Sequence, residues 1–149
     1  MAAEKEGQSA LDLFPETLIN AEGKEVTRDS LKGKTLGIYF SAHWCPPCKV
    51  FTPKLVAFRN ANKDKFEIVF VSSDKDEKAQ LGYMKEAGMK WPAVKYATKE
   101  IGELKKKYAI RGIPTLVIVD EKGETVSMNG RGDVTSSPDK ALAKWTAAK

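Results

Sequence analysis

The stretch YFSAHWCPPCKVFTPKL, Tyr39 to Leu55, decides the fold and holds both cysteines of the chain, its only histidine and three of its seven prolines. Cys45 and Cys48 have the spacing C-x-x-C, which is about one turn if the segment is helical. Two cysteines in 149 residues are too few for a disulfide framework. The pair therefore indicates thiol chemistry.

The residues around the cysteines predict a strand followed by a helix. TLGIYFS, residues 35–41, is a mostly apolar, β-rich run, which is typical of a strand covered on both faces. A helix is predicted over residues 46–62, because Phe51, Leu55 and Phe58 then form one apolar stripe. Cys45 would lie at the start of this helix.

The rest of the chain alternates strands and helices. Further strands are predicted in a hairpin over residues 18–26, over residues 66–74 and in a closing pair over residues 113–128, and helices over residues 74–88, 99–108 and 138–149. Arg131 to Asp133 is assigned to a polar turn, and Trp145 to the core. Such alternation predicts parallel strands with right-handed crossovers, to which the closing pair adds antiparallel strands. We expect one α/β domain over residues 11–149, with a mixed central sheet, helices on both faces and an N-terminal β-hairpin, after a flexible N-terminus over residues 1–10.

The start of a helix favours a thiolate at Cys45. Unpaired backbone N–H groups and the helix dipole stabilise negative charge there, so the pKa of Cys45 should fall below that of a free thiol. Cys48, one turn later, could attack a mixed disulfide on Cys45 and release the partner. Pro46 and Pro47 occupy the first helical positions, where a missing N–H is tolerated, and Trp44 would form an exposed platform beside Cys45.

Other uses of the pair are less consistent with the sequence. A structural metal site needs about four ligands, and His43 is too close to Cys45 to complete one with the two cysteines. Covalent haem attachment needs C-x-x-C-H, but residue 49 is lysine. A purely structural bridge would close a very small loop and gain little chain entropy. His43 itself could tune Cys45 or be a solvated loop residue.

The composition limits the partners and the location. The net charge of +5 suits a lysine-rich surface rather than a dedicated nucleic-acid face. No apolar run approaches the roughly 20 residues that cross a membrane. The polar start MAAEKEGQSALDLF does not resemble a secretory signal, so we expect a cytoplasmic protein, or a periplasmic or secreted one if a leader has been removed.

The motif YFSAHWCPPC resembles the active-site signature of the thioredoxin superfamily, within it that of tryparedoxins and nucleoredoxin-like proteins. The resemblance extends from about Leu18 to Asp133 and includes FEIVFVSSD, KWPAVKY and YAIRGIPTLVIVD. It implies the three-layer thioredoxin-like fold. It also implies that Pro114 is a cis-proline facing the cysteines and that Ile113 presents its backbone to an extended substrate peptide.

One position, Tyr39, departs from the pattern of ordinary thioredoxins, and Trp91 could have either of two roles. Ordinary thioredoxins bury an aspartate six residues before the first cysteine as a proton acceptor, but that residue is Tyr39 here. Tyr39 could take part in the chemistry or simply fill the core, and Cys48 must lose its proton to water or another group. Trp91, in the Trp-Pro loop, could help to choose partners or could cover the sheet.

The sequence therefore predicts a dithiol–disulfide oxidoreductase that needs no metal and no bound cofactor, because the sulfurs carry the electrons. Its expected partners are disulfide-bearing proteins, by resemblance peroxiredoxin-like ones, and an upstream dithiol or reductase, with no nucleic acid and no membrane. We expect a monomer. The alternatives are a redox-sensing binding module and a periplasmic thioredoxin of the cytochrome-maturation kind.

Overall fold

The computed structural model describes residues 9–96 and 98–147. The strands are β1 (Thr17–Ile19), β2 (Glu25–Thr27), β3 (Thr35–Ser41), β4 (Phe66–Ser72), β5 (Thr115–Val119) and β6 (Thr125–Ser127). The helices are α2 (Pro46–Ala61), α3 (Glu77–Ala87), α4 (Lys99–Lys107), α5 (Gly130–Ser136) and α6 (Pro138–Ala147), with 3-10 turns η1 (Ala10–Leu13) and η2 (Arg28–Leu31). Residues 1–8 of the expected flexible terminus lie outside the described residues, whereas Ser9 caps η1 and Ala10 is buried within it.

The four-stranded sheet has the order β4-β3-β5-β6 and is mixed, as the sequence predicted. β3 pairs in parallel with β4 along its whole length and antiparallel with β5, which pairs antiparallel with β6. The N-terminal hairpin of β1 and β2 joins this sheet through Ala93, which bridges Ile19 on one side and Phe70 of β4 on the other. Strand β1 and the Trp-Pro loop thus meet at the β4 edge of the sheet.

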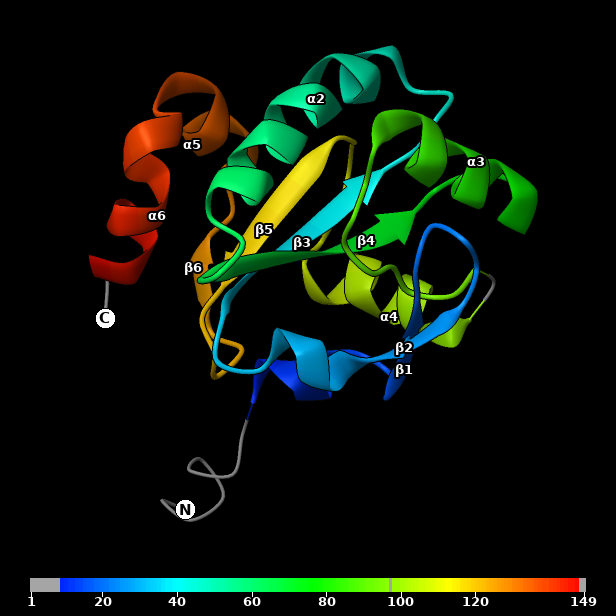
Figure 1. Ribbon diagram of the computed structural model, residues 1–149, viewed down its shortest axis with the longest axis horizontal. Coiled ribbons are helices and arrows are strands. Elements are labelled where there is room, and N and C mark those ends of the chain that lie inside the picture. The colour runs from blue at the N-terminus through cyan, green and yellow to red at the C-terminus, as the bar shows by residue number, and fades with distance from the viewer. Residues whose placement is uncertain (1–8, 97, 148–149) are drawn as a thin grey trace.

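Helices cover both faces of the sheet (Figure 1). On one face, α2, α3, α5 and α6 pack through residues such as Leu55, Met84 and Trp145. On the other face, α4 and the two 3-10 turns pack through residues such as Leu104 and Leu31. Every residue of β3 and β4 is buried, because these two strands are enclosed from both sides. Among the described residues, no helix has the length and apolar character needed to cross a membrane.

The assignment of Arg131 to Asp133 to a polar turn is wrong, because these residues lie in α5. Asp133 is buried, and its carboxylate accepts hydrogen bonds from Ser127 Oγ (3.0 Å), Lys144 Nζ (3.0 Å) and Trp145 Nε1 (2.9 Å). The sequence of this short helix, GRGDVTS, consists mostly of glycines and polar residues, so no apolar periodicity indicated a helix here. Contacts with β6 and α6 stabilise it, and Trp145 lies in the core as predicted.

Candidate functional site

Cys45 and Cys48 lie where β3 has ended and α2 begins. Cys45 is the N-cap of α2, with an extended backbone, and its Sγ accepts a hydrogen bond from the Cys48 N–H at 3.3 Å. The two cysteines form a disulfide, and their Cα atoms are 5.2 Å apart. The sulfur of Cys45 therefore occupies the position where the helix offers unpaired N–H groups and the positive end of its dipole.

The two sulfurs differ in their access to solvent. Cys48 is completely buried, whereas 4% of Cys45 is exposed. Pro46 and Pro47 are exposed beside Cys45, and Trp44 is 63% exposed, which agrees with the predicted platform. A protein partner can therefore approach Cys45 but not Cys48.

The segment before β5 forms the other side of the site. The Ile113–Pro114 peptide bond is cis, as the resemblance implied. The carbonyl oxygen of Ile113 lies 3.8 Å from Cys45 Sγ, and the partly buried Ile113 side chain packs against the cluster formed by Ala42, Cys45 and Cys48. The start of β5 and the start of α2 thus meet at the disulfide although they are far apart in sequence.

Asp74 fixes the loop that carries His43 and Trp44. Its Oδ1 accepts a hydrogen bond from the His43 N–H (2.8 Å), and its Oδ2 accepts one from the Ser72 hydroxyl (2.6 Å). The Trp44 indole donates to the Ser73 carbonyl oxygen (3.0 Å). Asp74 does not cap α3, because the N-cap of that helix is Asp76. The role of Asp74 in holding the loop was not predicted from the sequence. The sequence feature that could have indicated it is an aspartate directly after the buried strand β4, which runs parallel to β3.

His43 contacts α3 instead of being free in solvent. Its ring stacks on Tyr83, with the ring centroids 5.0 Å apart, and its Nε2 lies 2.8 Å from Glu86 Oε2. His43 is a half-buried loop residue, as one of the two interpretations expected, but its side chain is held against α3. These contacts tie the loop before Cys45 to α3.

A cluster of buried hydroxyls lies behind Cys48. Thr52 Oγ1 donates to the Cys48 carbonyl oxygen (2.7 Å) and is hydrogen-bonded to the hydroxyls of Tyr39 (2.6 Å) and Tyr83 (2.7 Å). The Tyr83 hydroxyl is also bonded to Ser41 Oγ (2.7 Å). We call Tyr39, Ser41, Thr52 and Tyr83 the hydroxyl network.

Tyr39 is fully buried and stays protonated. Burial, and then the nearby Tyr83, raise the pKa of Tyr39 far above its ordinary value. A neutral phenol does not replace the carboxylate of ordinary thioredoxins as a proton acceptor. Tyr39 instead supports the first turns of α2 through Thr52.

Trp91 lies in the core beneath the site. It is 1% exposed, and its ring makes an edge-on contact with Tyr39 at 6.5 Å between centroids. Its indole N–H has no hydrogen-bond partner among the residues that the structure describes. This burial supports the interpretation of Trp91 as a cover of the sheet and excludes direct contact with a partner.

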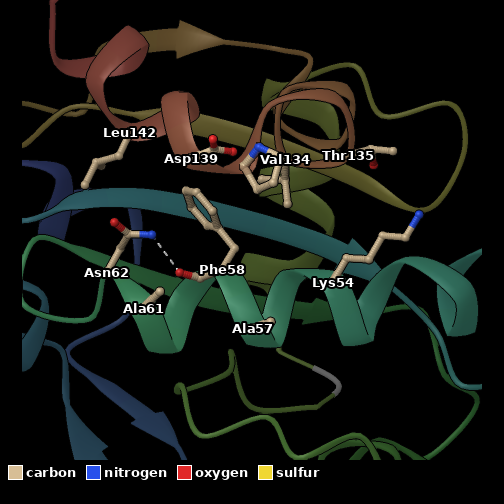
Figure 2. Close-up of a pocket in the computed structure, with 10 residues that line it drawn as sticks. Lys54, Ala57, Phe58, Ala61, Asn62, Val134, Thr135, Asp139 and Leu142 are labelled. Carbon is tan, nitrogen blue, oxygen red and sulfur yellow. Dashed lines mark hydrogen bonds between the residues drawn. The ribbon is translucent and has the colours of Figure 1, made fainter.

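A groove with a volume of about 530 Å³ lies between α2, α5 and α6 (Figure 2). Apolar side chains such as Ala57, Val134 and Leu142 line it, and neither cysteine does. Within residues 9–96 and 98–147 there is also no group of three or more histidine, cysteine or acidic side chains that could hold a metal ion.

Comparisons with known proteins agree with this geometry. Residues 33–125 match a family model described as thioredoxin-like. The chain is 45% identical over 122 residues to a probable nucleoredoxin 1 from Arabidopsis thaliana, covering 80% of this chain and 21% of that protein. It is 40% identical over 132 residues to a nucleoredoxin from Bos taurus, covering 86% of this chain and 30% of that protein. The chain thus spans less than a third of these two curated relatives.

Solved structures match over almost their whole length. A tryparedoxin from Trypanosoma brucei superimposes with a TM-score of 0.81 at 35% identity, covering 92% of this chain and 98% of that one. A thioredoxin from Wuchereria bancrofti gives a TM-score of 0.77 at 40% identity, with the same coverage of 92% and 98%.

Proposed function

The chain belongs to the thioredoxin-like family, and from this we propose that it is a thiol–disulfide oxidoreductase that reduces protein disulfides through Cys45-Pro46-Pro47-Cys48. The observation that carries the proposal is the disulfide at the start of α2, of which only Cys45 reaches solvent. A structural bridge would have no need of an exposed tryptophan beside it. The similarity to tryparedoxins and nucleoredoxins supports the same activity.

In the proposed reaction, the reduced protein begins with a thiolate at Cys45. This thiolate attacks one sulfur of a partner disulfide, so that the partner's S–S bond breaks, a mixed disulfide forms and the other partner sulfur leaves as a thiolate that takes a proton. The thiolate of Cys48 then attacks Cys45 Sγ and releases the second partner sulfur. The partner gains two electrons and two protons, and the protein ends with the Cys45–Cys48 disulfide.

The surroundings of Cys45 favour both steps. The Cys48 N–H that points at Cys45 Sγ stabilises negative charge on it, both in the attacking thiolate and when Cys45 becomes the leaving group. Ile113 offers backbone groups next to the reacting sulfur, where an extended substrate segment could pair as an added strand. Because Cys48 is buried, it meets only the mixed disulfide that Cys45 has formed.

The chemistry of the two cysteines also suggests which cofactor, partners and location to propose. No bound cofactor is needed, because the two sulfurs carry both electrons. The proposed substrates are disulfide-bearing proteins, among them peroxiredoxin-like ones, and the proposed donor is an upstream dithiol or reductase. A reductant of this kind works where its cysteines are kept reduced, so we propose a cytoplasmic location. We also propose that the protein is a monomer.

Reduction of insulin tests the activity directly. With dithiothreitol as the donor, the wild-type protein should accelerate the reduction of insulin, and Cys45→Ser should abolish the acceleration. Cys48→Ser should accumulate a mixed disulfide between Cys45 and the substrate, which mass spectrometry identifies. If the wild type does not accelerate reduction, and the double Cys→Ser variant still binds a partner of the wild type, the chain is a binding module and the proposed reaction is wrong.

A further inference from the structure

Two hollows lie on either side of the exposed start of α2. The first has a volume of about 420 Å³, and Trp44, Lys49 and Lys75 are among the residues that line it. The second has a volume of about 520 Å³ and is lined in part by Val50, Lys54 and Arg131, next to Pro47. We call these the tryptophan hollow and the valine hollow.

Each hollow combines two cations with an exposed apolar side chain. Lys49 and Lys75 are exposed in the tryptophan hollow, and Lys54 and Arg131 are exposed in the valine hollow. Within the part of the chain that the structure describes, none of these four side chains forms an ion pair. Their charges are therefore available to a partner.

The acidic side chains near the hollows are already engaged. Asp74 is the only described carboxylate that lines either hollow, but it is buried and accepts hydrogen bonds from the His43 N–H and Ser72. Glu86 pairs with His43, and Asp76 caps α3 by accepting from the Ala79 N–H. The four cations outnumber Asp74, the one described carboxylate that lines either hollow, so the lysine, arginine and acidic side chains that line the two hollows carry a net positive charge.

We propose that these two hollows select substrates in which acidic residues flank the target disulfide. This inference rests on the proposed function and names the substrate class of the same site. Carboxylates on either side of the substrate disulfide would face Lys49 and Lys75 on one side and Lys54 and Arg131 on the other. Apolar or aromatic substrate residues would cover Trp44, which is 63% exposed, and Val50, which is 67% exposed.

Two synthetic peptides test the inference. They carry the same disulfide, flanked by glutamates in one peptide and by lysines in the other. The fully reduced protein should reduce the acidic peptide roughly tenfold faster than the basic one at low ionic strength, and the ratio of the two rate constants should fall as salt is added. Stopped-flow measurement gives both rate constants, and their ratio cancels any change in the intrinsic reactivity of Cys45.

Charge reversal locates the effect. Lys49→Glu/Lys75→Glu should bring the ratio down by at least about threefold, and Lys54→Glu/Arg131→Glu should do the same from the other side. The matched control is Lys63→Glu/Lys65→Glu, which makes the same change in net charge at exposed positions beyond the far end of α2. This control should leave the ratio close to that of the wild type.

The outcomes separate the two proposals. Equal rates for both wild-type reactions at low salt would overturn the inference while leaving the oxidoreductase activity in place. A control variant that lowers the ratio as much as the hollow variants would also overturn it, since net charge alone would then explain the preference. Failure to reduce either peptide would count against the proposed function itself.

Discussion

Replacing Thr52 with valine removes the hydroxyl that joins the buried groups behind Cys48. The substitution conserves shape, so it tests the hydrogen bonds with little change in packing. Thr52 Oγ1 makes three hydrogen bonds, to Tyr39, Tyr83 and the Cys48 carbonyl oxygen, all between 2.6 and 2.7 Å. At about 1 kcal/mol each, their loss amounts to about 3 kcal/mol, and to about 2 kcal/mol if Tyr39 recovers one bond within the cluster.

Urea denaturation of the oxidised protein measures this loss. With an m value of about 2 kcal/mol/M, a loss of 2–3 kcal/mol lowers the urea midpoint by about 1–1.5 M. Thr52→Ser is the matched control, because it keeps the hydroxyl and removes only a methyl group, at about 1 kcal/mol. The m value should not change in either variant.

A double-mutant cycle isolates the contact with Tyr39. Tyr39→Phe should lower the free energy of unfolding by about 1 kcal/mol less in the Thr52→Val protein than in the wild type, because the bond that it deletes is already absent. If Thr52→Val loses less than about 0.5 kcal/mol, or if Thr52→Ser is equally costly, the hydroxyl network does not stabilise the site as argued.

Three further predictions concern other parts of the molecule. Burial alone would raise the pKa of Asp133, but its three hydrogen bonds outweigh burial and lower the pKa. Asp133→Asn should therefore lower the free energy of unfolding by about 1–3 kcal/mol at pH 7. Thermal melts should show that the difference from the wild type shrinks once the pH falls below about 4, where the carboxylate of the wild type begins to take up a proton. Gly130→Ala should destabilise by about 1–3 kcal/mol in denaturant titrations, because its Cβ would lie 2.8 Å from a backbone carbonyl oxygen of β5. Gly82→Ala in α3 is the control for this prediction: its added Cβ would have no atom within 4 Å, so the variant should be no less stable than the wild type. In the reduced protein, mass spectrometry after brief treatment with iodoacetamide should find Cys45 alkylated before Cys48, and equal labelling would contradict the burial of Cys48.

The sequence determined the elements whose signals are local. The residues predicted for the strand before the motif are those of β3, and α2 begins at Pro46 as expected. Continuous apolar runs, helical spacing and proline at the first helical position all act over a few residues, so they can be found without knowing the fold. The same holds for Cys45 as N-cap and for Trp44 as an exposed neighbour.

Only the tertiary structure decided the contacts that connect distant segments. The hydroxyl network joins residues 13, 31 and 42 positions apart, and no periodicity places Tyr83 of α3 against Thr52 of α2. The short helix α5 depends in the same way on Asp133 reaching residues of β6 and α6. Such contacts form because burial leaves polar groups no water to bind, so each must find its partner wherever the packing of the sheet and helices brings one.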